Sequence, residues 1–209
     1  SLCYNCHMPH TTYGLLKAMR SHQVDSPNAQ ASLSTGRPNA CNQCHLDKTL
    51  AWTGRELASG WGVESPEFSE EQGAVAASVV WAVTGDAAQR ALMAWSMGWE
   101  PAREISGEDW QPLILSQLLA DPYPAVRFIA ARSLRSLPGF EEFDYDADWS
   151  VEKQREAAQA AASRWTRTHR QGGGQARPEM LIEGPGKLDQ TRFEALLQRR
   201  NDRRVVINE

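Results

Sequence analysis

From residue 66 onward, apolar residues recur at helical spacing with polar residues between them, which predicts a series of amphipathic helices. We expect five helices. The first begins at Ser65-Pro66-Glu67 and buries Val75, Val79, Val80 and Val83, and the second has Ala88, Leu92, Trp95 and Trp99 on one face. The third covers Pro112–Leu119, and the fourth buries Val126, Ile129, Ala130, Ser133, Leu134 and Leu137. The fifth is longer, over Ser150–Thr168, and buries Val151, Ala158, Ala162 and Trp165.

The two ends of the chain have a different pattern. Residues 1–62 are rich in Asn, Ser, Thr, Gly and Pro, and we predict only short helical pieces there, at Leu15–Arg20 and Leu46–Ala58. Residues 171–175 have the composition of a flexible linker. Beyond it, we predict a helix over Leu188–Arg199 and a strand or packed arm at 204–207. The chain therefore divides into 1–62, 63–170 and 171–209, and its fold class is mostly α.

The helices of the middle region pair up and repeat. Placing Arg90 under Arg127 aligns two apolar segments at an offset of 37 residues, which is near the period of two-helix solenoid repeats. The string DPYPAVRFIAARSL, Asp121 to Leu134, resembles the second half of a HEAT-type repeat. We expect a HEAT-like α-α repeat solenoid over 63–170, whose units bury their apolar faces by stacking on neighbours.

Composition and charge exclude several classes of protein. The chain has 209 residues, 41% of them hydrophobic and 23% charged, as in ordinary soluble proteins. It has no apolar run near the roughly 20 residues of a membrane span. The formal net charge is −4, and without a clustered basic face we expect no nucleic-acid partner. The acidic stretch 141–148 is interpreted as a solvated loop pinned by its aromatic residues, with docking of a basic partner as the alternative.

All four cysteines belong to two copies of one pattern. Cys3-Tyr4-Asn5-Cys6-His7 and Cys41-Asn42-Gln43-Cys44-His45 both read Cys-x-x-Cys-His, the pattern of covalent c-type haem attachment. Two thiols three positions apart on one helical turn reach the two vinyl groups of one porphyrin, and the adjacent histidine ligates the iron. The sequence therefore predicts two c-type haems, with Cys3, Cys6, Cys41 and Cys44 as attachment residues and His7 and His45 as proximal ligands.

Other uses of four cysteines stay open at this point. They include a redox-active Cys-x-x-Cys, which needs no following histidine, a structural zinc site with four cysteine ligands, and two disulfides. We favour haem because the histidine follows both motifs and every cysteine in the chain is used.

Low-spin haems also need distal ligands. His22 follows a predicted helical piece that would let it reach over a haem, and we take it as a distal ligand. His10 is too close to His7 to serve the same iron, so it either ligates the other haem or lies at the surface. His169 ends a predicted helix, where the helix dipole favours it. Met8 and Met19 are not expected to ligate.

Aromatic and polar residues near the second motif have two interpretations each. Trp52 and Trp61 either line a haem pocket or pack between domains. Asn39 and Asn42 are candidates to cap the short helix of the motif.

The segment from Cys3 to Trp52 resembles a known family. The residues that carry the resemblance are Cys6-His7-Met8-Pro9, Thr12-Tyr13, Ser21-His22, Pro38-Asn39-Ala40-Cys41, Cys44-His45, Asp47-Lys48 and Trp52. They resemble the doubled haem-attachment segment of bacterial multihaem c-type cytochromes, which implies a small irregular dihaem domain followed by helical repeats. In that family an Asp-His pair stands where this chain has Ser21-His22, and its histidine is a candidate distal ligand. The resemblance therefore supports His22 as a distal ligand, although serine replaces the aspartate in this chain.

The resemblance also implies function and location. We expect one-electron transfer in the periplasm or outside the cell, with the helical repeats as a scaffold or docking surface for redox partners or further haem-bearing chains. A haem enzyme that reduces a nitrogen oxyanion or peroxide at a five-coordinate haem is the alternative, and a partner-binding protein is a third class. Ser1 lies two residues before the first cysteine of the motifs, so we expect a fragment, a processed chain or an oligomer subunit. In the last case a neighbouring chain would be able to supply one distal ligand.

Overall fold

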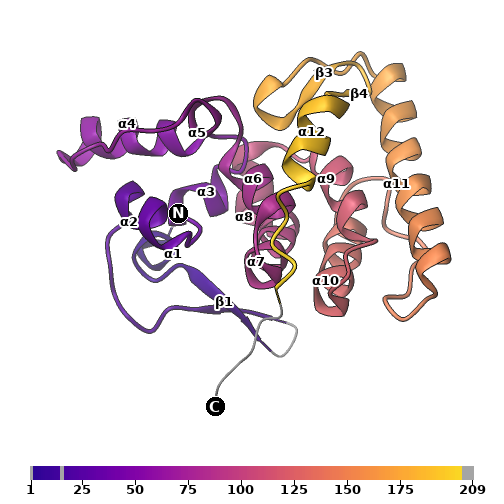
Figure 1. Cartoon of the computed structure of the whole chain (residues 1–209), viewed down its shortest axis with the longest axis horizontal. Coiled ribbons are helices and arrows are strands. Elements are labelled where there is room, and N and C mark those ends of the chain that lie inside the picture. Colours follow the sequence, from indigo (N-terminus) through magenta and orange to yellow (C-terminus); the bar gives the residue numbers. More distant parts are fainter. Residues whose placement is uncertain (1, 15–16, 204–209) are drawn as a thin grey trace.

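The computed structural model of the chain describes residues 2–14 and 17–203. This part is mostly α, as expected, with twelve α-helices, one 3-10 helix and two short hairpins (Figure 1). The predicted strand or arm at 204–207 lies outside the described residues.

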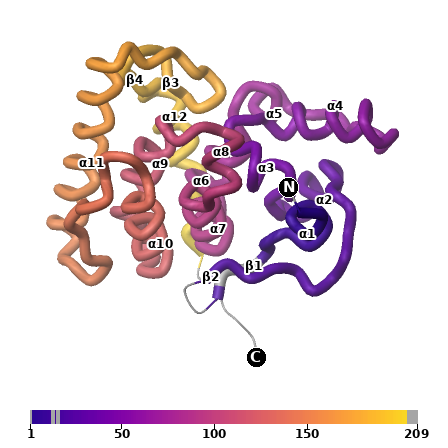
Figure 2. The backbone as a smooth tube through the Cα atoms, turned by 180° about the vertical axis from the view of Figure 1, so that it is seen from behind, coloured from indigo at the N-terminus to yellow at the C-terminus, as the bar shows by residue number. Residues whose placement is uncertain are grey.

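The N-terminal part consists of short elements beside the larger helical body (Figures 1 and 2). They are α1 (Cys3–His7), β1 (His10–Gly14), β2 (Lys17–Arg20), α2 (Ala29–Thr35) and α3 (Ala40–Cys44). The predicted helical piece at Leu15–Arg20 is wrong, because its described residues form β2, which pairs antiparallel with β1. A piece this short has too few hydrogen bonds to persist as a helix alone, whereas the hairpin supplies a partner strand.

Next, α4 (Leu50–Trp61) and α5 (Glu70–Ala74) extend from one end of the body (Figure 1). The predicted helix start at Pro66 is wrong, since α5 begins four residues later. Ser69 accepts from the Gln72 amide while the Gln72 side chain accepts from the Ser69 amide, and this capping box fixes the start. The predicted helix is also interrupted, because Ala76 leaves helical geometry to pair with Thr49.

The body consists of helices packed side by side (Figure 1). In order they are α6 (Ala77–Thr84), α7 (Ala87–Gly98), α8 (Glu100–Ser106), α9 (Gln111–Leu118), α10 (Pro124–Arg135) and α11 (Val151–Gln171). Helix α7 packs against both α6 and α10, and α9 packs against α10 and α11. One continuous hydrophobic core runs through these helices.

The predicted buried faces are confirmed in some helices and wrong in others. The six residues predicted for the buried face of the fourth helix are all buried, five of them in α10 and Leu137 just after its end. In α11 Trp165 is buried as predicted, but the rest of the buried face consists of Gln154, Ala157, Ala161 and His169. Val151 is exposed, and Ala158 and Ala162 are only partly buried. The alanine-rich sequence of α11 fits several faces almost equally, so its contact with α9 decides which one is buried.

An arginine in α7 and an arginine in α10 each make the same kind of hydrogen bond to the turn before the helix. Arg90 Nη1 donates to the carbonyl of Gly85 at 2.7 Å, and Arg127 Nη1 donates to the carbonyl of Pro122 at 3.2 Å. Each acceptor lies five residues before its arginine. The alignment of Arg90 with Arg127 thus corresponds to equivalent positions in two helix–turn–helix pairs.

The C-terminal region turns back over the body. It comprises η1 (Pro178–Met180), β3 (Ile182–Gly184), β4 (Lys187–Leu188) and α12 (Gln190–Leu197). Helix α12 packs against α6 and falls within the predicted range Leu188–Arg199. In the predicted linker the Gly174 amide donates to the carbonyl of His169, so this segment is hydrogen-bonded to the end of α11.

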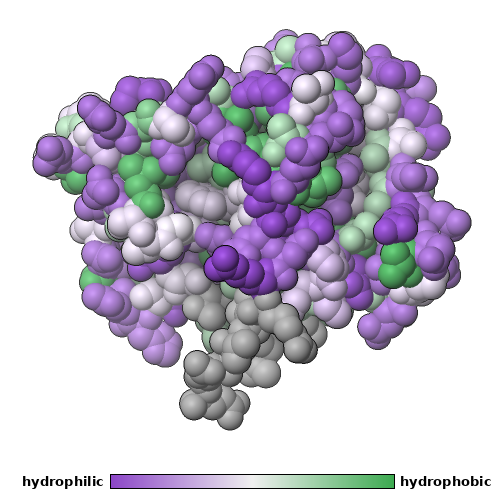
Figure 3. Space-filling view, in the orientation of Figure 1, coloured by the Kyte–Doolittle hydropathy of each residue, from purple (hydrophilic) through white to green (hydrophobic). Residues whose placement is uncertain are grey.

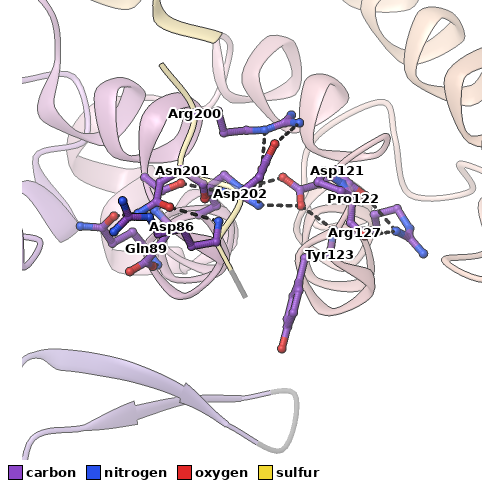
Figure 4. Close-up of polar contacts among 12 residues, drawn as sticks. Asp86, Gln89, Asp121, Pro122, Tyr123, Arg127, Arg200, Asn201 and Asp202 are labelled. Carbon is purple, nitrogen blue, oxygen red and sulfur yellow. Dashed lines mark hydrogen bonds and ion pairs between the residues drawn. The ribbon is translucent and has the colours of Figure 1, made fainter. Parts of the chain in front are cut away.

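A buried ion pair joins three distant parts of the chain. The Arg90 guanidinium donates to both oxygens of Asp121, at 2.7 and 3.0 Å, and both side chains are about 1% exposed. Arg90 also donates to the carbonyl of Asn201 at 2.9 Å, and the Asn201 amide donates to the carbonyl of Thr84. The pair therefore links α7, the turn before α10 and the C-terminal segment (Figure 4).

The acidic loop 141–148 is pinned from several sides, as its aromatic residues predict. Tyr145 is buried and donates its hydroxyl to the carbonyl of Leu119. Arg135 donates to the carbonyls of Phe143 and Tyr145, and Arg127 to that of Ala147. These arginines therefore bind the backbone of the loop.

Over the described ranges, no helix combines the length and apolar character that crossing a bilayer requires. On the face in Figure 3, hydrophobic residues form small separate groups among hydrophilic ones.

Replacing Asp121 with Asn is expected to reduce the free energy of unfolding by about 3 kcal/mol. The buried Arg90 charge then keeps only the half-exposed carboxylate of Asp202, at 3.5 Å, as a counter-ion. Denaturant unfolding measures this loss. The matched control is Glu108→Gln, which removes the partly exposed pair between Glu108 and Arg103 and should cost less than about 1 kcal/mol. An equal loss of unfolding free energy in the two variants would contradict the stabilising role of the buried pair.

We expect the stabilising contribution of the buried Tyr145 hydroxyl to be lost at alkaline pH. Burial raises the pKa of its hydroxyl from 10 to about 12. The protonated form is favoured in the fold, so its stabilisation is complete below pH 10 and is lost as pH rises toward 12. In unfolding experiments at about pH 8 and about pH 11, the stability advantage of wild type over Tyr145→Phe should shrink. An equal difference in unfolding free energy between wild type and Tyr145→Phe at the two pH values would contradict this prediction.

Candidate functional site

The two Cys-x-x-Cys-His motifs lie on two one-turn helices that pack against each other, α1 and α3. The first motif forms the whole of α1, and the second occupies most of α3 with His45 as its C-cap. The structure therefore places both motifs on helical turns, as the attachment chemistry requires, and brings the two turns side by side.

His7 is oriented by the backbone of a later segment. Its Nδ1 lies 2.8 Å from the carbonyl oxygen of Asp25. A carbonyl can only accept, so in the neutral form of this ring the proton lies on Nδ1 and the lone pair on Nε2. The Asp25 amide donates in turn to the carbonyl of His7. An imidazole held in this way has the tautomer that a metal-ligating histidine uses.

The intervening residues of the second motif anchor α3 to the protein. Asn42 is buried, donates to the carbonyl of Lys48 and accepts from the hydroxyl of Thr53 in α4. Gln43 is buried and donates to the carbonyl of His10 at 2.6 Å. The prediction that Asn42 caps the helix is therefore wrong. Asn39 does cap it, because its side chain accepts from the Cys41 amide.

His45 packs against an aromatic ring of the next helix. Its ring centroid lies 4.9 Å from that of Trp52, at the start of α4. Burial lowers the pKa of His45, which favours the neutral imidazole that a metal ligand must be. Trp52 thus lies beside the second motif, whereas Trp61 is 76% exposed at the end of α4 and covers no part of it.

The four thiols are free in the structure, with Cys3 and Cys6 exposed and Cys41 and Cys44 partly buried. Burial raises the pKa of both Cys41 and Cys44 to about 11, and the negative charge that Cys6 carries when ionised adds to both increases. Cys6 therefore lies close to the second motif. None of the four thiols is in a disulfide.

The candidate distal ligands lie in different surroundings. His22 is exposed, in a segment that pairs with the end of the first motif through the Ser21 amide and the carbonyl of Pro9. The ring of His10 is buried and lies 4.2 Å from that of Trp95 and 5.4 Å from that of Trp99, both in or next to α7.

The remaining candidates lie outside this arrangement or add little to it. His169 is at the end of α11, as predicted, where its ring packs 4.2 Å from that of Trp165. Met19 is 45% exposed on β2. Met8 is the C-cap of α1.

The side chains of both motifs fit an attached haem. Each turn carries its two thiols three positions apart, and His7 has a free Nε2. A zinc site needs its ligands in one cluster, and within residues 2–14 and 17–203 no three His, Cys, Asp or Glu side chains are gathered closely enough to hold a metal ion.

Comparison of the chain with protein-family models, with curated proteins and with solved structures finds no match. The site is therefore interpreted from its own residues.

Sequence reasoning did not identify two residues that shape the site and gave a third the wrong role. The two are Arg20, which contacts α1, and Gln43, which anchors α3. The third is Asn42, which anchors α3 and does not cap it. Their polar character was visible in the sequence, but their partners lie far along the chain, and no local spacing reveals such contacts.

The two pairs of thiols are expected to differ in reactivity in the haem-free chain. With a pKa of about 11, Cys41 and Cys44 are almost entirely protonated near neutral pH, and only the thiolate is nucleophilic. Cys3 and Cys6, which are exposed, should react with iodoacetamide at least about tenfold faster, measured by mass spectrometry of labelled peptides. In guanidinium the four rates should converge. Equal rates in the folded chain would contradict the arrangement.

Proposed function

We propose that this chain is a dihaem c-type cytochrome that transfers electrons. The observation that carries the proposal is the pair of adjacent one-turn helices, each presenting two free thiols and a histidine. Cys3 and Cys6 would hold one haem and Cys41 and Cys44 the other, with His7 and His45 as proximal ligands. When bound, each haem supplies the one-electron chemistry of its iron.

Residues of the chain would orient the two proximal histidines. The carbonyl of Asp25 fixes the His7 imidazole, and Trp52 packs on His45. Because α1 and α3 are in contact, the two attachment sites are neighbours. This proximity supports electron exchange between the sites within one chain.

For the distal positions we propose His22 and His10. His22 is exposed next to the first motif, which leaves its imidazole available. His10 is packed between tryptophan rings, so ligation would require it to leave that contact. His22 is therefore the better supported of the two.

We propose that the helical region forms a HEAT-like solenoid that serves as scaffold and docking surface for redox proteins or further haem-bearing chains. The equivalent contacts of Arg90 and Arg127 in two successive helix pairs support the repeat. Covalent haem attachment in bacteria takes place outside the cytoplasm, so we propose a periplasmic or extracellular location.

Haem content tests the proposal directly. The chain, produced in a bacterial host that matures c-type cytochromes, should carry two covalent haems by pyridine haemochrome assay and intact mass. Cys3→Ala with Cys6→Ala should leave one haem, and the matched variant Cys41→Ala with Cys44→Ala should leave the other. Bound zinc without a Soret band would refute the proposal.

A further inference from the structure

The first haem-attachment helix cannot hold its own shape. Helix α1 has five residues, none of them buried, and its N-cap residue Leu2 makes no side-chain hydrogen bond. Helices of a single turn are unstable in isolation, and their terminal carbonyls need partners from outside the helix. The conformation of α1 must therefore be imposed by another part of the chain.

Arg20 supplies those partners. Its Nη1 donates to the carbonyls of Tyr4 and Met8, both at 3.1 Å, and its Nη2 donates to Oδ1 of Asn5 at 2.6 Å. Its guanidinium carbon lies 4.3 Å from the centroid of the Tyr4 ring. Tyr4 and Asn5 are the two intervening residues of the motif, so Arg20 contacts the part of the turn that the attachment pattern leaves free.

Arg20 is itself fixed to the body of the protein. It pairs with His10 across the hairpin, and the His10 ring is packed against Trp95 and Trp99. The guanidinium thus connects α1 to a buried cluster on the helical region.

We propose that Arg20 is the positioning residue of the first haem-attachment helix: by binding Tyr4, Asn5 and Met8 it holds the turn so that Cys3, Cys6 and His7 face one porphyrin. This inference rests on the proposed function. Each thiol would add its sulfur and its hydrogen across one vinyl double bond. The S–H bond and the π bond of the vinyl group break, one C–S and one C–H bond form, and nothing is released. The two additions need both thiols in register on the turn.

The planar fork of Arg20, rather than its charge, explains the contacts. Three acceptors around one guanidinium suit the fixed donor geometry of arginine, which the point charge of lysine does not reproduce. The second motif is held differently, by Asn39, Asn42 and Gln43. Loss of Arg20 should therefore affect the first motif and spare the second, which becomes an internal control.

The test compares Arg20→Gln, Arg20→Lys and the matched control Lys17→Gln, which removes a positive charge from an exposed position on the same strand. Haem occupancy at each motif is measured by mass spectrometry of proteolytic peptides from the matured full chain. We expect occupancy at Cys3 and Cys6 to fall roughly fivefold or more in both Arg20 variants, with the second motif and Lys17→Gln unchanged.

A second readout does not require haem. In the haem-free chain, amide hydrogen exchange at Asn5 to Met8 should accelerate in both Arg20 variants and stay unchanged over the amides of α3. Full occupancy in Arg20→Gln would overturn the proposal. So would full rescue by Arg20→Lys, which would assign the effect to charge, and so would equal loss of haem at both motifs.

Failure of this inference and failure of the proposed function give different results. If wild type carries two haems and Arg20→Gln also carries two, only the positioning role is refuted. If wild type carries no haem, the proposed function is refuted, and the exchange experiment still decides whether Arg20 orders the turn.

Discussion

A single helical turn has too few internal hydrogen bonds to fix the positions of its side chains, and both Cys-x-x-Cys-His motifs lie on such turns. Everything around them compensates for this constraint. The first turn is held by Arg20 and by the carbonyl of Asp25. The second is held by buried Asn42 and Gln43. In both motifs the intervening residues bind the protein, which leaves the thiols and histidines free for a cofactor.

These anchors connect the N-terminal elements to the helical body. His10 lies at the junction, because its carbonyl accepts from Gln43 while its ring packs on Trp95 and Trp99. Burial between these rings lowers the pKa of His10 to about 4, so the ring is neutral at ordinary pH and packs without a charge. The N-terminal region therefore depends on α7 for its position.

Helix α7 contacts both the N-terminal hairpin and the helices that follow it. One side carries Trp95 against the hairpin, and another carries Arg90, whose buried pair with Asp121 fixes α10. The carbonyl of Asn201 accepts a hydrogen bond from the same guanidinium. A helical scaffold assembled in this way fixes the attachment turns relative to its own surface, as a docking role for that surface would require.

The sequence by itself determined the mostly helical class, the buried face of α10 and the two Cys-x-x-Cys-His turns, because these depend on spacings of a few residues. Only the tertiary structure decided that Lys17–Arg20 is a strand, which face of α11 is buried, and that Arg20 holds the first motif. The physical reason is range. Arg20 reaches Asn5 across 15 residues and Gln43 reaches His10 across 33, and the alanines of α11 distinguish their faces only by what packs against them.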